Sequence, residues 1–144
     1  MKFWDTSAIV PLCVAEPASA TVKSILSQDS SIVVWWGTRT ECISALMRQR
    51  REGGLSLQSE RQARHLLRLL ADSWSEVQPS DLLRATADGL LAAHSLRAAD
   101  AFQLAAALQW CQRRTTDKEL ATFDIRMREV ARNEGFTILP VKIR

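Results

Sequence analysis

The chain has 144 residues, of which 47% are apolar, so it can bury a hydrophobic core in one compact domain and is not a disordered tail. Nineteen basic and 16 acidic side chains give a formal charge of +3, which permits nucleic acid as a partner without demanding it. Three scattered cysteines argue against a disulfide scaffold or a structural zinc site, and no apolar run is long enough for a bilayer, so we expect a cytoplasmic protein with no membrane partner.

Strands and helices are predicted to alternate along the chain. The apolar segment 2–4 ends on Asp5 and predicts a strand that enters a helix, and Pro17 predicts the start of a second helix. The continuous β-branched and aromatic run 31–36 predicts a strand buried on both faces, as in a parallel sheet. The later elements are helices at 38–51 and 59–70, a short strand at 74–78, a helix capped by Ser80, a helix at 98–110, a strand at 119–124, a helix at 125–133 and a β-rich run at 136–141. We therefore predict one α/β domain over 1–144, with a central parallel sheet of four to five strands covered by helices on both faces.

Four carboxylates lie at the edge of such a sheet where ligands usually bind. Asp5 ends the first strand and Asp124 ends the strand at 119–124, and the crevice beyond the carboxyl ends of parallel strands is the usual ligand site. Glu41 lies in the first turn of the helix after the second strand, and Asp100 lies at the start of the Ala-rich helix. We expect all four side chains to face one crevice.

Each acid also has a purely structural explanation. Asp5 and Asp124 can cap the helices that follow them. Thr38-x-x-Glu41 matches a capping box, and Asp100 can be a first-turn acid that the helix dipole favours. Taken singly, these explanations are the commoner ones. Four acids directed at one crevice favour a site, and a residue can cap a helix and hold a ligand at once.

The chemistry of four carboxylates favours a hard cation. Crowded carboxylates raise one another's pKa, and a bound cation removes that cost. Mg²⁺ prefers oxygen ligands, and Mn²⁺ accepts similar ones. His65 and His94 lie in helical stretches away from the strand ends, which argues against zinc.

Four segments of the chain carry a family resemblance: 3–8, 38–42, 96–107, and 121–124 with 126–131. They resemble the motifs of PIN-domain ribonucleases of the VapC type, the toxin half of bacterial toxin–antitoxin pairs. The third segment is the most specific. Their order and spacing cover almost the whole chain. The resemblance implies a three-layer α/β/α fold, a magnesium-dependent endoribonuclease, a homodimer and neutralisation by a cognate antitoxin.

The resemblance also implies the acidic set Asp5, Glu41, Asp100 and Asp124. Our hypothesis is that the three aspartates hold the metal, while Glu41 orients a water or acts as general base. Asp117 is an alternative for the last position, because a threonine precedes it too, but the apolar strand favours Asp124.

Hydroxyl and basic side chains near the acids are candidates for supporting roles. Thr6, Ser7 and Thr122 can position the carboxylates through hydrogen bonds, although helix capping and strand packing explain them equally well. Trp35 and Trp36 can stack on bases, but at least one is expected in the core. Six arginines lie on or beside the predicted helices that carry Glu41 or follow Asp124: Arg39, Arg48, Arg50, Arg51, Arg126 and Arg128. They can contact RNA phosphates, although a solvated, charged helix face is the commoner explanation.

Other functions fit less well. A phosphatase with Asp5 as nucleophile would want a second Asp two positions on, where Ser7 stands, and a receiver domain would want a Lys after a late strand. A catalytically inactive RNA- or protein-binding module on the same fold is the remaining alternative, and the presence of all four acids weighs against it.

Overall fold

The structure is a computed structural model that describes residues 1–143. Its centre is a five-stranded sheet in the order β3-β2-β1-β4-β5, with every neighbouring pair parallel. The strands are β1 (Lys2–Trp4), β2 (Ile32–Trp35), β3 (Ser75–Val77), β4 (Glu119–Ala121) and β5 (Thr137–Leu139). Because all strands run the same way, their carboxyl ends share one edge of the sheet.

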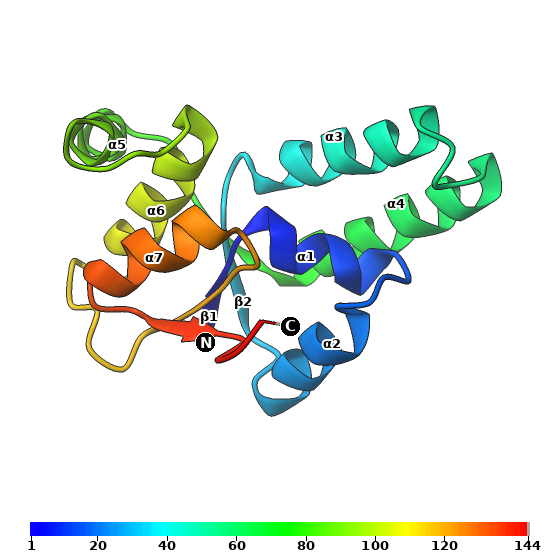
Figure 1. The fold of residues 1–144 in the computed structure, drawn as a ribbon, viewed down its shortest axis with the longest axis horizontal. Coiled ribbons are helices and arrows are strands. Elements are labelled where there is room, and N and C mark those ends of the chain that lie inside the picture. Colours follow the sequence, from blue (N-terminus) through cyan, green and yellow to red (C-terminus); the bar gives the residue numbers. More distant parts are fainter. Residues whose placement is uncertain (144) are drawn as a thin grey trace.

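Within residues 1–143, seven helices cover the sheet on both faces (Figure 1). They are α1 (Thr6–Cys13), α2 (Ser19–Gln28), α3 (Thr38–Arg51), α4 (Leu57–Ser73), α5 (Asp81–Ala93), α6 (Ala98–Trp110) and α7 (Ile125–Asn133). The predicted α/β class with a parallel sheet and three layers is confirmed. Among the helices of residues 1–143, none combines the length and apolarity that crossing a bilayer requires.

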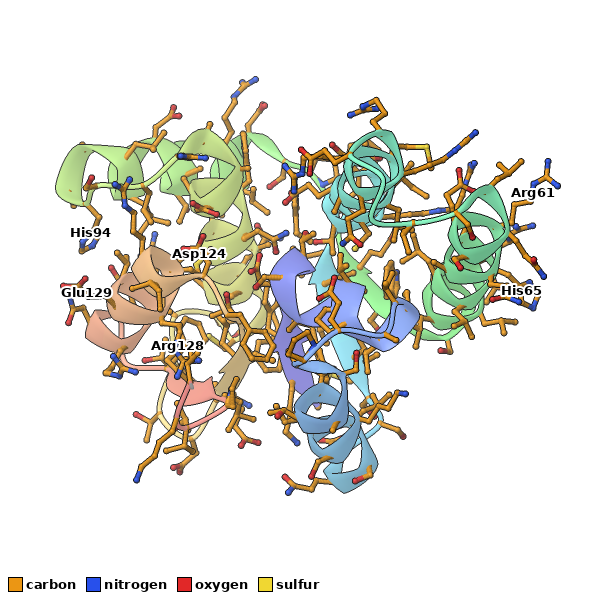
Figure 2. All side chains as sticks on the ribbon, turned by 45° about the vertical axis from the view of Figure 1, so that its right-hand side comes forward. Arg61, His65, His94, Asp124, Arg128 and Glu129 are labelled. Carbon is orange, nitrogen blue, oxygen red and sulfur yellow. The ribbon has the colours of Figure 1, made fainter. Side chains whose placement is uncertain are left out.

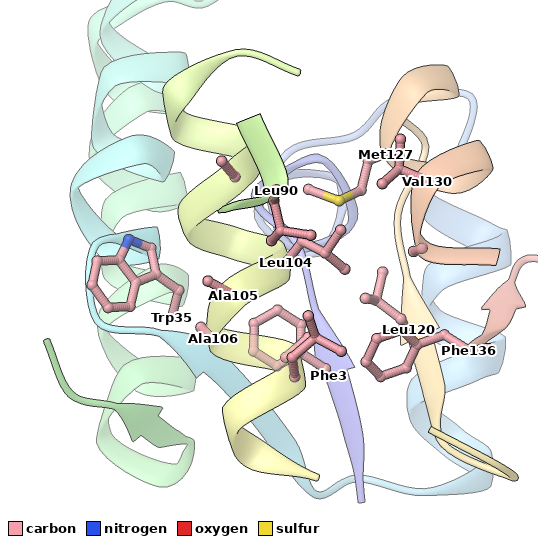
Figure 3. Close-up of a cluster of buried hydrophobic side chains, with 14 of the residues drawn as sticks. Phe3, Trp35, Leu90, Leu104, Ala105, Ala106, Leu120, Met127, Val130 and Phe136 are labelled. Atoms are coloured by element: carbon pink, nitrogen blue, oxygen red, sulfur yellow. The ribbon is translucent and has the colours of Figure 1, made fainter. Parts of the chain in front are cut away.

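Two separate cores sit on the two faces of the sheet. Side chains of neighbouring strand positions point to opposite faces, so Phe3 packs with α5, α6 and α7, while Trp4 packs with α1 to α4. Figure 3 shows the first core, in which Phe3 and Leu120 lie against Leu104 of α6. Both faces of the central strands are therefore buried, as their continuous apolar sequence predicts.

The elements differ from the sequence prediction mainly at their ends. Pro17 lies in a turn, and α2 begins two residues later at Ser19, whose hydroxyl bonds the Val14 carbonyl and accepts from the Glu16 amide. The second strand ends at Trp35, and Trp36 is 52% exposed in the turn before α3. Hydrogen bonds, rather than apolar composition, define where an element begins and ends, so a sequence pattern misplaces these ends.

Candidate active site

The predicted acids gather at the carboxyl edge of the sheet. Glu41 of α3, Asp100 of α6 and Asp124 at the start of α7 line one cleft of about 660 Å³, together with Thr6 of α1. Asp5 follows β1 at the same edge and is 5% exposed, so it lies deeper than the other three. Figure 2 shows Asp124 at the start of α7, beside α6. The structure thus brings together residues that are up to 119 positions apart in the sequence because three different helices start at one edge.

Asp5 is held by the hydroxyl groups that the sequence singles out. Its Oδ2 accepts hydrogen bonds from the Ser7 hydroxyl at 2.7 Å, the Thr122 hydroxyl at 2.8 Å and the Ser7 amide at 3.4 Å. Thr122 Oγ1 also accepts from the Asp124 amide at 3.1 Å, and Ser7 Oγ accepts from the Phe123 amide at 2.9 Å. These bonds tie the loop after β4 to Asp5. Within residues 1–143 they all reach Oδ2, which leaves Oδ1 of Asp5 for a ligand.

Glu41 is oriented by side chains from two other helices. The Thr6 hydroxyl donates to Glu41 Oε1 at 3.1 Å, and Gln103 Nε2 lies 3.4 Å from each carboxylate oxygen. The capping box does not form, because Gly37 occupies the N-cap position and Thr38 begins the helix. The carboxylate of Glu41 therefore faces the cleft instead of the start of its own helix.

Gln103 is a buried polar residue that sequence reasoning missed. It is 1% exposed, and its Nε2 donates to the Thr38 hydroxyl at 2.9 Å and the Thr6 hydroxyl at 3.1 Å. Its Oε1 is buried and has no partner within the described part of the chain. The signal was a polar residue inside the apolar run of α6, three positions after Asp100 and therefore on the same face of the helix.

Of the two candidates for the last acid, Asp124 lines the cleft. Its Oδ1 accepts from the Met127 amide at 2.9 Å and caps α7. Asp117 instead lies in an exposed turn with a positive φ of 61°, before β4 and so at the opposite end of that strand. Asp117 does not line the cleft.

Burial and mutual repulsion raise the pKa of Asp5, Glu41 and Asp100. Burial raises the pKa of Asp5, the hydroxyls of Ser7 and Thr122 oppose this, and the Asp124 charge adds to it. Burial likewise raises the pKa of Glu41, against the hydrogen bonds from Thr6 and Gln103. The pKa of Asp100 rises to about 6, first through burial and then through the charges of Asp124 and Asp5. The site therefore concentrates negative charge that a cation would neutralise.

Arginines surround the acids, although not all of those expected. Arg48, Arg97 and Arg126 line the cleft. Arg97 was not among the expected arginines; it is the N-cap residue of α6 and stands three positions before Asp100. Arg128 is 6% exposed and donates to the carbonyls of Thr122 at 2.8 Å and Pro140 at 2.5 Å, so neither a solvated helix face nor a phosphate contact describes it.

The two neighbouring tryptophans divide between core and surface. Trp35 is 8% exposed and stacks on Phe102 of α6, with ring centroids 5.6 Å apart and planes at 4°. Trp36 is half exposed and meets Trp35 edge-on. The expectation that at least one of the pair belongs to the core is confirmed, which leaves only Trp36 with an open face.

The donor set suits a hard divalent cation. The cleft offers carboxylate oxygens, which are the ligands that Mg²⁺ and Mn²⁺ prefer. No histidine or cysteine lines it. Within residues 1–143, no three His, Cys, Asp or Glu side chains form a ready-made ligand group. Mg²⁺ commonly uses only one or two carboxylates and completes its sphere with water and substrate phosphate, so the residues present fit such an ion.

Comparison with known proteins identifies the family. The family model of the PIN domain matches residues 2–133, and the chain therefore belongs to the PIN-domain family. No curated protein matches the chain.

Two solved structures share the fold at low sequence identity. One is Mycobacterium tuberculosis VapC20, described as a sarcin-ricin loop cleaving toxin, with a TM-score of 0.68, 17% identity, and coverage of 95% of this chain and 97% of that chain. The other is FitAcB from Neisseria gonorrhoeae, with a TM-score of 0.65, 17% identity, and 96% of each chain covered. At this identity the likeness extends to the fold.

Proposed function

We propose that this PIN-domain protein is a metal-dependent endoribonuclease and the toxin component of a type II toxin–antitoxin pair. The observation that carries the proposal is the single cleft lined by Glu41, Asp100 and Asp124, with Asp5 beside it and arginines around it. An acidic centre suits a metal ion and an arginine rim suits phosphates, so the cleft is suited to a phosphodiester bound through a metal. The likeness to VapC20, a toxin that cleaves an RNA loop, supports RNA as the substrate class.

In this proposal the three aspartates Asp5, Asp100 and Asp124 hold a divalent ion, Mg²⁺ in the first place and Mn²⁺ as the alternative. A bound ion of this kind supplies an activated water and neutralises charge at the phosphate. Glu41, oriented by Thr6 and Gln103, accepts the proton of the attacking water, and its raised pKa suits that task. Ser7 and Thr122 keep Asp5 in place by hydrogen bonds to its Oδ2.

The arginines of the cleft have the complementary task. Arg48, Arg97 and Arg126 hold the phosphates on either side of the cut bond, since a guanidinium binds phosphate oxygens through two parallel N–H groups. Attack by water breaks the bond between phosphorus and the 3′ oxygen. The products are then a 5′-phosphate and a 3′-hydroxyl.

The proposal includes a cognate antitoxin and a homodimer as protein partners. Exposed apolar side chains on α4 support a protein contact, because Leu66 is 43% exposed and Leu69 is 53% exposed. Leu67 between them is buried in the core, which keeps the helix in place while its outer face stays free.

The test is cleavage of mixed total RNA by the purified, antitoxin-free protein with Mg²⁺. We expect cuts that disappear with EDTA and with Asp5→Asn. Asp117→Asn removes the same charge from an exposed turn outside the cleft and serves as the matched control. Ends that carry a 2′,3′-cyclic phosphate would contradict the mechanism. A folded protein that binds RNA and leaves it intact under all conditions would indicate the inactive binding module instead.

A further inference from the structure

A second cleft, lined by positive side chains, lies on the other side of the helix that carries Glu41. Three arginines, Arg39 of α3 and Arg64 and Arg68 of α4, line a cleft of about 290 Å³ whose apolar part is Ile43 and Leu67. All three arginines are exposed, and within residues 1–143 none of them makes an ion pair or a side-chain hydrogen bond. We name this surface the arginine cleft.

The arginine cleft lies in a part of the chain that has more basic than acidic side chains. Residues 38–73, which form α3 and α4, contain seven arginines and four acidic side chains. This excess of three equals the formal charge of the whole protein, so the remaining residues are balanced. Figure 1 shows α3 and α4 side by side, extending away from the sheet. A concentrated charge of this kind attracts a polyanion far better than the same charge spread over the surface.

We call the cleft lined by Glu41, Asp100 and Asp124 the acidic cleft. Helix geometry places it and the arginine cleft on opposite flanks of α3. Glu41 and Ala45 are four residues apart and line the acidic cleft, and Arg39 and Ile43 are also four residues apart and line the arginine cleft. The two pairs are offset by two residues, which is about 200° around a helix with 3.6 residues per turn. One helix of roughly 10–12 Å diameter therefore separates the two clefts.

We propose that the arginine cleft binds the backbone phosphates of the RNA strand beyond the cut site. This inference rests on the proposed function, because the strand in the acidic cleft has to leave it over one of its walls, and α3 is a wall with three unpaired arginines behind it within residues 1–143. Guanidinium groups bind phosphate oxygens, and the partly apolar floor accepts a sugar or a base face. The arginine cleft thus adds affinity for longer RNA and takes no part in the bond cleavage.

The salt dependence of RNA binding tests this proposal. The probe is a fluorescein-labelled single-stranded RNA of mixed sequence and roughly 16 nucleotides, bound in EDTA so that it stays intact, and followed by anisotropy at several salt concentrations. Each phosphate contact on a single strand contributes about 0.7 to the slope of log K against log salt. The triple variant Arg39→Gln, Arg64→Gln, Arg68→Gln is expected to reduce that slope by about 2.

A second triple variant controls for net charge. Arg84→Gln, Arg113→Gln and Arg114→Gln remove the same charge from exposed positions outside both clefts, and we expect the slope to stay close to that of the unchanged protein. In cleavage assays the arginine-cleft variant should show a raised KM for the long RNA with an unchanged kcat. Thermal unfolding of both variants should match the unchanged protein, because exposed arginines carry little stability.

Two results would overturn the proposal. An unchanged slope would mean that the arginine cleft does not meet RNA, as expected if it receives an acidic protein segment. An equal drop in both triple variants would mean that only the net charge matters. Because binding is measured without cleavage, either result is separate from a failure of the ribonuclease activity itself.

Discussion

Replacing Gln103 with Met should lower cleavage far more than stability. The substitution keeps the volume of the buried side chain and removes the amide that donates to Thr38 at 2.9 Å and Thr6 at 3.1 Å. Two neutral hydrogen bonds contribute about 2 kcal/mol in total. The same change removes the buried, unpartnered Oε1, whose desolvation costs about 1–3 kcal/mol. We therefore expect the free energy of unfolding to stay within about 1 kcal/mol of the unchanged protein.

The effect on cleavage has no such compensation. Gln103 donates both to Glu41 and to Thr6, which itself donates to Glu41, so the loss of the amide removes one contact to this carboxylate and the support of the other. General-base catalysis is commonly worth 10²- to 10⁴-fold, and a misplaced base forfeits part of this. We expect kcat to fall roughly 10- to 100-fold, with KM for RNA nearly unchanged.

Two comparison variants make this result specific. In Gln103→His the ring Nε2 lies the same number of bonds from Cα as the amide nitrogen, so its single N–H can donate to one of the two hydroxyls and should restore part of kcat. Gln109→Met changes an exposed residue on the same helix and should have no effect. Equal losses in the Met and His variants, or full activity of Gln103→Met, would refute the reasoning. Crystal structures of the two variants provide a check without activity, because Glu41 should leave Thr6 only in the Met variant.

Three further changes test other parts of the molecule. The pKa of Asp100 rises from 3.8 to about 6, so the folded state keeps a proton that the unfolded state loses, and metal-free stability should fall as the pH rises through this range. Asp100→Asn should flatten that decline and raise Tm at about pH 7 by a few degrees, while an unchanged pH profile would contradict it. Arg128→Met removes three hydrogen bonds to backbone carbonyls and should cost about 2–3 kcal/mol in urea unfolding, whereas a loss near zero would mean that the buried charge offsets them. Phe102→Ala removes the ring stacked on Trp35 and should cost about 2–3 kcal/mol and change the tryptophan emission, and unchanged emission would argue against the stack.

The sequence predicts the sheet and the positions of the acids because both follow from local patterns. Asp5 and Asp124 each follow a buried strand, and parallel strands deliver their carboxyl ends to one edge. Residues in contact across the fold are harder to recognise. Gln103 acts on α1 and α3, 97 and 65 positions away, and no periodicity within α6 reveals those partners.

Side-chain direction also escapes a one-dimensional pattern. Arg126 and Arg128 both follow Asp124, and both resemble phosphate contacts in the sequence. In the fold Arg126 lines the cleft, whereas Arg128 turns into the body of the protein and holds the segment after β5 through its carbonyl groups. The capping box at Thr38 does not form because Gly37 is the N-cap, and the Glu41 carboxylate bonds to Thr6 and Gln103 of other helices.

The capping bonds of Asp5 and Asp124 have a consequence for how such a protein can change over evolutionary time. Both residues accept a backbone amide at the start of a helix, so losing them weakens the fold as well as the site. Glu41 bonds only to side chains and caps nothing. A descendant that no longer cleaves RNA is therefore free to vary at position 41, whereas selection for folding alone should retain Asp, Asn, Ser or Thr at positions 5 and 124. Among relatives of this chain, the residue at position 41 is thus the better marker of retained activity.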